Sequence, residues 1–343
     1  MKNFWTELSK GFFCLAPMYD VTDAAFRAMF VKYSKPHVLF TEFVSADGLV
    51  NEEGRKKLLR ELYITSAERP IVAQIFGSNP ATIEQAVKLI KELKFDGVDI
   101  NMGCPDRAVE KQGAGSALIK NPKLAQEIIA AAKRGARSTG SGQASLPVSV
   151  KTRLGYNKID YDWIKTVLEA KPDAVTFHLR TRKEMSEAKA HYEVLPKIVE
   201  MFEGSGIPII INGDIESVEQ GEALAKKYKV DGVMIGRGAF GKPWLFGGEV
   251  VRSATSSEPE VVLRTTEEKL KIMLEHTKLF AELYLPGKTN DKLFHGHTKN
   301  FAVMRKHFKA YVTGFKGAMA LRAKLMQANN PDEVEKIINE FVD

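Results

Sequence analysis

Two cysteines stand in different surroundings, and only one of them is a candidate for chemistry. Cys104 lies between Gly103 and Pro105 at the end of an apolar run, so its thiol is expected on a rigid turn. Cys14 lies inside an apolar run and is expected to be a small buried hydrophobe. A thiol with an unperturbed pKa of about 8.5 is mostly protonated at neutral pH, so Cys104 is suited to donating a proton. The sequence shows no Cys/His/Asn set typical of a protease and predicts no metal site.

Two consecutive apolar runs in the second half of the chain end in glycine-containing polar segments, and the second of these segments also carries an arginine. Asn212-Gly213-Asp214 ends one run and Gly236-Arg237-Gly238 ends the next. Glycines let backbone N–H groups approach an anion closely, and Arg237 adds a charge-assisted contact. Either glycine alone would also suit a tight turn. Two such loops in succession favour a phosphate site.

Other polar side chains interrupt or end apolar runs. Lys151 and Arg153 lie two residues apart, and so on one face of a strand. A lysine in an apolar strand must leave the core or meet an anion, because an unpaired buried charge is costly. His178 ends the next run and is followed by Arg180; among cations around an expected phosphate, a functional histidine is slightly favoured. Gln74 could hydrogen-bond a flat heterocycle, but a structural role is equally consistent with it.

Eight apolar runs alternate with amphipathic segments of helix length, which is typical of parallel strands buried on both faces. The expected strands are Phe12–Ala16, Val38–Phe43, Ile71–Ile75, Gly97–Asn101, Val148–Arg153, Ala174–His178, Pro208–Asn212 and Gly232–Gly236. Eight β–α repeats predict a closed (β/α)8 TIM barrel with its sites at the C-terminal strand ends. A doubly wound open sheet is the alternative. It is disfavoured because Pro17-Met18, and no glycine-rich turn, follows the first strand.

The chain of 343 residues suits a barrel of about 250 residues with a small appendage. We expect a catalytic barrel over residues 1–250 and an all-helical domain over 260–343, joined by a polar linker at Ser253–Pro259. The expected C-terminal helices are Glu267–Leu285, Thr298–Tyr311, Ala318–Ala328 and one that begins at Pro331. No run reaches the ~20 apolar residues of a membrane span, and the N-terminus lacks a signal peptide. Together with only two cysteines, this favours a cytoplasmic protein.

Six motifs resemble, in order, those of the tRNA-dihydrouridine synthases. The barrel motifs are Ala16-Pro17-Met18 with Val21-Thr22-Asp23, Asn101-Met102-Gly103-Cys104-Pro105, Val150–Gly155, Asn212–Ile215 and Ile235-Gly236-Arg237. In the tail, Arg305-Lys306-His307 with the later Tyr311, Gly314 and Gly317 is similar to the bacterial B-type subfamily. The resemblance covers the whole barrel. One motif would be weak, but six in order are specific.

This resemblance implies an enzyme that binds FMN, takes electrons from NADPH (or NADH) and reduces uridine in tRNA. It implies hydride transfer to C6 of the uracil while Cys104 protonates C5, and it places Lys151 at the flavin N1–O2 edge. Residues implied near the substrate are Asn101, Arg153 and Arg180. The cofactor-binding residues that it implies are Ala16, Pro17, Met18, Gln74, Lys151, His178, Asn212, Gly213, Asp214, Gly236 and Arg237.

The sequence departs from the family pattern in two places. Leu179 fills a position at which relatives have a small residue, which leaves the role of Arg180 open. An insertion-like loop near Ser138–Ser145 is expected to lie between elements, away from the chemistry.

Positive charge is concentrated in the tail. The net charge of the chain is +7, and between residues 288 and 324 nine basic residues stand against Asp291 alone. Interleaved aromatic residues are expected to pack a helical core, while the cations face RNA phosphates. The candidates for phosphate contact lie in one expected helix without an acidic neighbour in sequence, and they are Lys299, Arg305, Lys306 and Lys309.

Two other functions fit part of the pattern. An FMN-dependent barrel enzyme acting on a small molecule, similar to dihydroorotate dehydrogenase, would explain the barrel but neither the basic tail nor the Gly-Cys-Pro turn. A non-catalytic RNA-binding barrel would leave Cys104 and Lys151 without a role. No obligate protein partner is expected.

Overall fold

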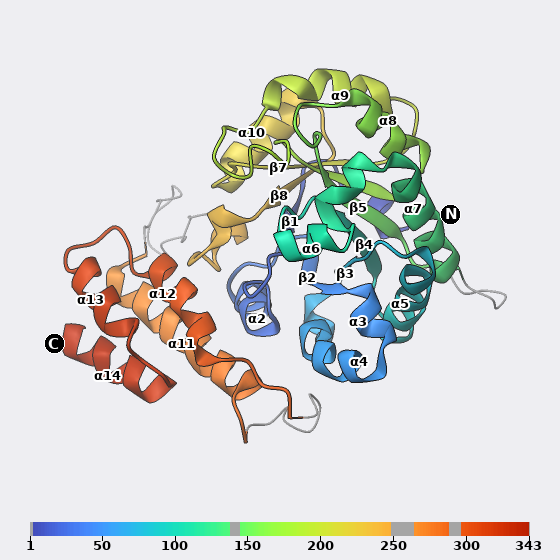
Figure 1. The fold of residues 1–343 in the computed structure, drawn as a ribbon. Coiled ribbons are helices and arrows are strands. Elements are labelled where there is room, and N and C mark those ends of the chain that lie inside the picture. The colour runs from blue at the N-terminus through green and yellow to red at the C-terminus, as the bar shows by residue number, and fades with distance from the viewer. Residues whose placement is uncertain (1–2, 138–144, 248–263, 288–295, 343) are drawn as a thin grey trace.

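The computed structural model describes residues 3–137, 145–247, 264–287 and 296–342. Eight parallel strands form one sheet in the order β1-β8-β7-β6-β5-β4-β3-β2 (Figure 1). The strands are β1 (Phe12–Leu15), β2 (Leu39–Ser45), β3 (Ile71–Phe76), β4 (Gly97–Met102), β5 (Val148–Arg153), β6 (Ala174–His178), β7 (Ile209–Asn212) and β8 (Gly232–Ile235). Each predicted strand is confirmed, with ends that differ by at most two residues.

The sheet closes between its first and last members in this order. Cys14 forms a parallel bridge with Val38, and the N–H of Leu15 donates to the carbonyl of Val38 at 3.1 Å. The N–H of Val38 donates to the carbonyl of Phe13 at 3.2 Å. The predicted (β/α)8 barrel is therefore confirmed, and an open sheet is excluded.

Helices cover the outside of the barrel (Figure 1). Asn79 and Asn121 cap the two longest of them, and each of these helices has a proline at its first position, a combination typical of helix starts. The barrel helices are α2 (Ala24–Tyr33), α3 (Ala46–Val50), α4 (Glu52–Leu58), α5 (Pro80–Glu92), α6 (Arg107–Lys111), α7 (Pro122–Ala136), α8 (Tyr161–Glu169), α9 (Leu195–Phe202) and α10 (Val218–Tyr228).

The barrel interior changes from apolar to polar along the strands. At the N-terminal ends, an apolar cluster that includes Phe12, Cys14 and Phe40 is joined by Trp5 of the short helix α1 (Phe4–Glu7). Beyond this cluster the strands carry polar side chains instead, from Ser149 and Asp99 to Gln74, Asn101 and Lys151, which lie nearer the C-terminal ends. Polar groups inside a barrel must be hydrogen-bonded or meet a ligand, which directs attention to this end.

After residue 263 the described chain is helical. Helices α11 (Thr266–Tyr284), α12 (Met304–Tyr311), α13 (Ala318–Leu325) and α14 (Pro331–Val342) form a bundle beside α2 (Figure 1). Ala24, Ala25 and Met29 of α2 belong to the apolar core of this bundle, so the bundle is packed directly on the barrel.

One helix boundary differs from the prediction. The helix expected from Thr298 begins at Met304, because Asn300 caps a separate 3-10 turn at Phe301–Val303. Lys299 precedes that turn and is not helical. The expected linker Ser253–Pro259 and most of the loop near Ser138–Ser145 lie outside the described residues.

Candidate active site

A cavity of about 740 Å³ opens at the C-terminal ends of the strands. Its volume lies within the usual range of small-molecule sites, which is about 300–1,000 Å³. The cavity is lined by every residue predicted to bind the cofactor except Gln74, namely Ala16, Pro17, Met18, Lys151, His178, Asn212, Gly213, Asp214, Gly236 and Arg237.

One end of the cavity is built from cations arranged around a carboxylate. Asp214 forms ion pairs with Arg180 and, at 3.0 Å, with Arg237. Nη1 of Arg180 lies 3.1 Å from Nε2 of His178. A guanidinium only donates, so Nε2 accepts and Nδ1 carries the proton. Burial and the neighbouring cations hold the pKa of His178 well below its usual range, so this imidazole is a neutral donor.

Two glycines leave backbone open to the same end. Gly213 has φ 131°, and an added Cβ would lie 3.1 Å from Cβ of Ala190 and 3.4 Å from Nη1 of Arg180. A Cβ on Gly236 would lie 3.4 Å from Cβ of Ala16. Bare backbone beside arginine donors and a neutral histidine forms a cradle that fits a phosphate monoester. These residues therefore fit the phosphate end of FMN.

Arg180 belongs to this end of the cavity. It is buried and held by Asp214 and His178, so its geometry favours a place at the phosphate end over the substrate contact implied by the resemblance. Leu179 points the other way into the core between barrel and helices, so its larger side chain leaves the cavity unaffected.

Lys151 lies between the phosphate end and the strand that leads to Cys104. Its Nζ donates to Oδ1 of Asn212 at 3.2 Å, and Asn101 is its register partner on β4. Burial and the nearby Arg153 lower the pKa of Lys151 to about 8. An anion or an electron-rich ring bound in the cavity would stabilise the charged lysine and so raise its pKa again.

A buried hydrogen-bond chain runs from the barrel interior to the turn that carries Cys104. Ser149 donates to Asp99 at 2.6 Å, and Nε2 of Gln74 donates to the same carboxylate at 2.7 Å. Nδ2 of Asn101 donates to Oε1 of Gln74 at 2.9 Å. The amide oxygen of Asn101 then accepts the N–H of Cys104 at 2.9 Å. The chain thus fixes Asn101 and, through it, the turn.

This chain gives Gln74 a position that sequence reasoning did not foresee. Gln74 is fully buried and uses both amide atoms on Asp99 and Asn101, so a direct cofactor contact stays a prediction. Asp99 was missed altogether, although a carboxylate within the apolar run Val98–Ile100 is itself a signal. Burial raises the pKa of Asp99 to about 6.

A second set of contacts holds the backbone at Cys104. Its carbonyl accepts from the N–H of Ser116 at 3.0 Å and lies 2.9 Å from the hydroxyl of that serine. Glu110 accepts from Ser116 and forms an ion pair with Arg182. Gly115 has φ 60°, and a Cβ there would lie 2.7 Å from the carbonyl oxygen of Cys104.

Arg153 completes this support. Its Nε donates to the carbonyl of Gly103 at 2.8 Å, and its Nη1 donates to the carbonyls of Thr181 and Met185 at 3.0 and 2.7 Å. Arg153 is 5% exposed. The geometry therefore favours a role in holding the turn over the predicted contact with substrate.

The two thiols differ as the sequence suggests. Cys14 is fully buried in the barrel interior, which confirms its structural role. Cys104 is partly exposed at the barrel mouth, and burial raises the pKa of its thiol. The thiol consequently keeps its proton at neutral pH.

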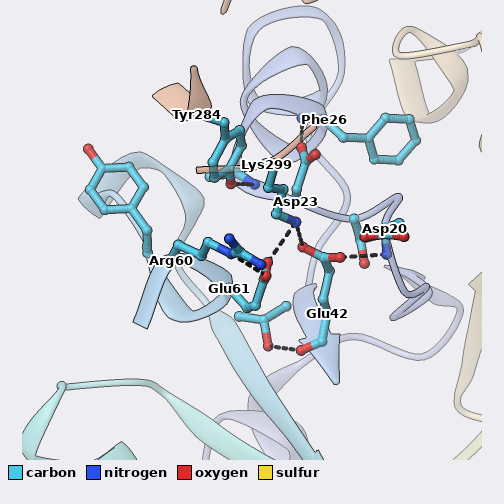
Figure 2. Close-up of polar contacts among 12 residues, drawn as sticks. Asp20, Asp23, Phe26, Glu42, Arg60, Glu61, Tyr284 and Lys299 are labelled. Atoms are coloured by element: carbon cyan, nitrogen blue, oxygen red, sulfur yellow. Dashed lines mark hydrogen bonds and ion pairs between the residues drawn. The ribbon is translucent and has the colours of Figure 1, made fainter. Parts of the chain in front are cut away.

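The structure contradicts one predicted RNA contact. Lys299 is 5% exposed, and its Nζ lies 2.5 Å from Glu42 and 2.6 Å from Glu61, so it is not available to a phosphate (Figure 2). Both partners come from the barrel and are remote in sequence, so no local pattern could reveal this pairing. Lys306 and Lys309 are exposed on α12, and Arg305 is half-buried.

Two negative findings concern the described ranges only. Among these residues, no group of three His, Cys, Asp or Glu side chains could hold a metal ion. None of the helices seen between residues 3 and 342 is long and apolar enough to cross a membrane.

The fold and site define a barrel with a cavity lined by cationic side chains and open backbone, and with a protonated thiol on a turn at the C-terminal ends of the strands. The profile of the dihydrouridine synthase (Dus) family matches residues 14–343, and the chain belongs to this family. It is 39% identical over 344 residues to a probable tRNA-dihydrouridine synthase of Staphylococcus aureus (strain COL), covering 99% of this chain and 96% of that protein. It is 37% identical to probable tRNA-dihydrouridine synthase 2 of Bacillus subtilis (strain 168), covering 99% and 97%.

Solved structures resemble the barrel at low sequence identity. Histamine dehydrogenase from Rhizobium sp. 4-9 has a TM-score of 0.50 at 14% identity, over 69% of this chain and 45% of that chain. A 2-naphthoyl-CoA reductase has a TM-score of 0.51 at 13% identity, over 70% and 50%. At such identities the similarity concerns the fold alone.

Proposed function

We propose that the protein is a tRNA-dihydrouridine synthase that reduces the C5–C6 bond of a uridine in tRNA, with FMN as cofactor and NADPH (or NADH) as reductant. Membership of the dihydrouridine synthase family supports this proposal. The observation that carries it is the position of Cys104, a protonated thiol on a held turn three residues after Asn101, whose register partner Lys151 lines the cavity with the phosphate cradle.

The residues around the cavity have distinct roles toward FMN. His178, Arg237 and the open backbone at Gly213 and Gly236 would hold the phosphate, while Asp214 orients the arginines. Lys151 also lines the cavity, and its charge would stabilise the negative charge that reduction adds to the flavin ring. When bound, the cofactor supplies the hydride that is added to C6 of the uracil.

Cys104 supplies the proton. Its S–H proton goes to C5 of the uracil as C6 receives the hydride, so the product gains two hydrogen atoms and the thiolate regains a proton from water. Asn101 fixes the turn that carries the thiol by accepting the N–H of Cys104. The raised pKa of the thiol suits a donor, because the proton is present when the substrate arrives.

The helical region suits an RNA partner. We infer a catalytic unit over residues 1–250 and an RNA-binding unit over 260–343, in which Arg305, Lys306 and Lys309 contact phosphates. A uracil in folded RNA must be swung out of its stack to enter a barrel mouth, and a separate grip on the RNA backbone assists this.

A genetic experiment tests the function. Mass spectrometry of tRNA from cells that lack the gene is expected to show the loss of dihydrouridine at one or more positions. The wild-type gene is expected to restore it, and a gene that encodes Cys104→Ala is not. Unchanged dihydrouridine in the deletion strain, with no second enzyme of the family present, would contradict the proposal.

A further inference from the structure

Lys299 joins the helical region to the barrel through a buried ion pair (Figure 2). Its Nζ lies 2.5 Å from Oε2 of Glu42 on β2 and 2.6 Å from Oε2 of Glu61. Glu42 is 0% exposed and Glu61 is 7% exposed. A charge buried to this degree is kept only where it is paired, so each partner depends on the others.

A β-bulge explains why Glu42 faces the helical region. The register of β2 against β3 shifts between Phe40 and Phe43, so Phe43, and not Glu42, stands opposite Gln74. Bulges redirect side chains in this way and are common beside active sites. Glu42 is thereby turned out of the row that faces the barrel interior and toward Lys299.

The other oxygen of Glu42 reaches the loop that lines the cofactor cavity. Oε1 accepts the backbone N–H of Asp20 at 2.5 Å. Asp20 has φ 53°, a left-handed conformation that few residues adopt unless contacts hold it. Pro17 and Met18, just before it, line the cavity. One carboxylate thus links Lys299 with the loop beside the cofactor.

Further contacts fix Lys299 itself. Its backbone N–H donates to the carbonyl of Tyr284 at 3.1 Å, and its Nζ lies 5.1 Å from the centre of the Tyr284 ring. The hydroxyl of Tyr284 accepts the N–H of Ala24, the first residue of α2, at 2.9 Å. The ammonium is therefore held in place from the helical region as well as from the barrel.

We propose that Lys299 and Glu42 are positioning residues for the cofactor, so that the helical region completes the cofactor site of the barrel. Lys299 holds the Glu42 carboxyl in place, and Glu42 holds the Asp20 turn that shapes the Pro17–Met18 wall of the cavity. The identity of the cofactor as FMN rests on the proposed function, but the mechanical link does not.

The physical basis is that the ammonium of Lys299 holds the Glu42 carboxyl in the orientation that reaches Asp20. Burial and the neighbouring Glu61 raise the pKa of Glu42, and the charge of Lys299 opposes this effect. Without the lysine, the carboxyl loses the contact that orients it and shifts further toward its neutral form, so its hydrogen bond to the N–H of Asp20 weakens. The turn then samples other conformations, and part of the binding energy of the cofactor is spent on ordering it.

Binding of FMN to the cofactor-free full-length chain, followed by flavin fluorescence at a temperature where every variant is folded, tests this link. Lys299→Met and Glu42→Gln are each expected to raise the FMN dissociation constant about tenfold. The double variant is expected to be no weaker than Glu42→Gln alone, because both changes act through one hydrogen bond. Additive effects would overturn the proposal.

Two control variants separate positioning from general stability. Lys278→Met removes an exposed ion pair with Glu335 inside the helical region and is expected to leave FMN affinity unchanged. Glu61→Gln alters the other partner of Lys299 but leaves the buried ammonium paired with Glu42 and the bond from Asp20 to Glu42 intact, so its effect on FMN affinity is expected to stay within about twofold. If Lys299→Met does not fold, the comparison of Glu42→Gln with Glu61→Gln decides. Equal weakening by the two would overturn the proposal.

A readout without cofactor separates this inference from the proposed function. Hydrogen exchange at the amide of Asp20 in the apo protein is expected to be at least about tenfold faster in Lys299→Met than in wild type. The Lys278→Met variant is expected to exchange at the wild-type rate. Unchanged exchange would overturn the link, whereas a wild-type protein that binds no FMN would refute only the cofactor assignment.

Discussion

Burial shifts the pKa values of Lys151 and Cys104 in opposite directions, and each shift has a chemical consequence. It lowers the pKa of Lys151 to about 8 and raises the pKa of Cys104, because a low-dielectric environment disfavours the charged form of either group. For Cys104 the consequence is a proton kept until it is needed. For Lys151 the consequence is that the ammonium form is only marginally favoured near neutral pH. An anionic ligand in the cavity would stabilise this charged form and raise the pKa of the lysine.

The role of Cys104 predicts a selective loss. Cys104→Ala is expected to leave FMN binding and NADPH oxidation nearly intact, while dihydrouridine formation falls by about 10²–10⁴, the usual contribution of a general acid. The matched variant Cys14→Ala removes a buried thiol from the barrel interior and is expected to change the rate little. Equal losses in the two variants would refute the assignment.

The pKa of Lys151 predicts how FMN binding depends on pH. The folded pKa of about 8 lies below the ordinary 10.5, so the ammonium loses its proton as the pH rises through about 8. FMN affinity in wild type is expected to fall between about pH 7 and pH 9. In Lys151→Met, binding is expected to be weak and flat over this range. If FMN affinity depended on pH in the same way in both proteins, a group other than Lys151 would be responsible.

The same shift predicts the stability of the cofactor-free protein. A depressed lysine pKa means that the cost of burying the charge is present below about pH 8 and is relieved as the pH rises toward the unfolded value. Lys151→Met is therefore expected to unfold at a higher temperature than wild type at neutral pH, with a difference that shrinks above about pH 8. A less stable variant in thermal unfolding would contradict this.

At the scale of elements, the turn after β4 is held by contacts from several directions. Asn101 holds it from the strand, Ser116 from the following 3-10 turn and Arg153 from β5. Such redundancy restricts the backbone that carries the thiol, and a displacement of about 1 Å at a catalytic group can cost about 10²-fold in rate.

Gly115 offers a test of this rigidity. Gly115→Ala places a Cβ 2.7 Å from the carbonyl oxygen of Cys104 and is expected to slow dihydrouridine formation about tenfold or more with little change in FMN affinity. Gly204 also has positive φ, but a Cβ there meets nothing within 4 Å. Gly204→Ala therefore carries the same backbone strain without the clash. Equal activity of the two variants would show that the turn tolerates displacement.

How far the sequence predicts the elements depends on whether contacts are local. The strands and the helices capped by Asn79 and Asn121 follow from apolar periodicity and caps, and they are found within two residues or less. The helix expected from Thr298 fails because Asn300, a strong cap, starts a new turn there.

Contacts between remote segments account for what the sequence did not predict. The partners of Lys299 lie on β2 and just after α4, and the bulge that turns Glu42 toward it has no local signature. In the same way, Asp99 can be recognised in the sequence as a carboxylate within an apolar run. Its hydrogen-bond partners Gln74 and Ser149 cannot be predicted locally, because they come from the two neighbouring strands. The lining of the cavity was predictable because it sits at strand ends, whereas the support behind it was not.

At the scale of the whole molecule, the helical bundle is packed on α2 beside the barrel mouth (Figure 1). Lys306 on α12 lies 3.5 Å from Asp20, on the loop that borders the cavity. A surface for RNA on α12 would therefore continue toward the cavity.

Three cations of the helical region remain candidates for contacts with tRNA phosphates, because Lys299 is buried in ion pairs. Replacing Arg305, Lys306 and Lys309 by Gln is expected to weaken tRNA binding uniformly across sequences, with a loss in salt slope of about 0.9 per phosphate contact removed. NADPH-driven reduction of the flavin is expected to survive. The control variant replaces the exposed Lys226, Lys227 and Lys229 at the other end of the barrel and removes the same charge. Equal salt slopes in the two variants, measured by titration at several salt concentrations, would end the proposal.

Reduction of uridine in tRNA by this barrel can be followed in a single-turnover experiment. Purified protein loaded with FMN is reduced with NADPH without oxygen, then mixed with unmodified tRNA or with free uridine, and the products are measured by mass spectrometry. We expect reoxidation of the flavin together with an equal amount of dihydrouridine in the tRNA, and no product from free uridine. Reduced flavin that persists with tRNA, or that is consumed by free uridine instead, would contradict this expectation.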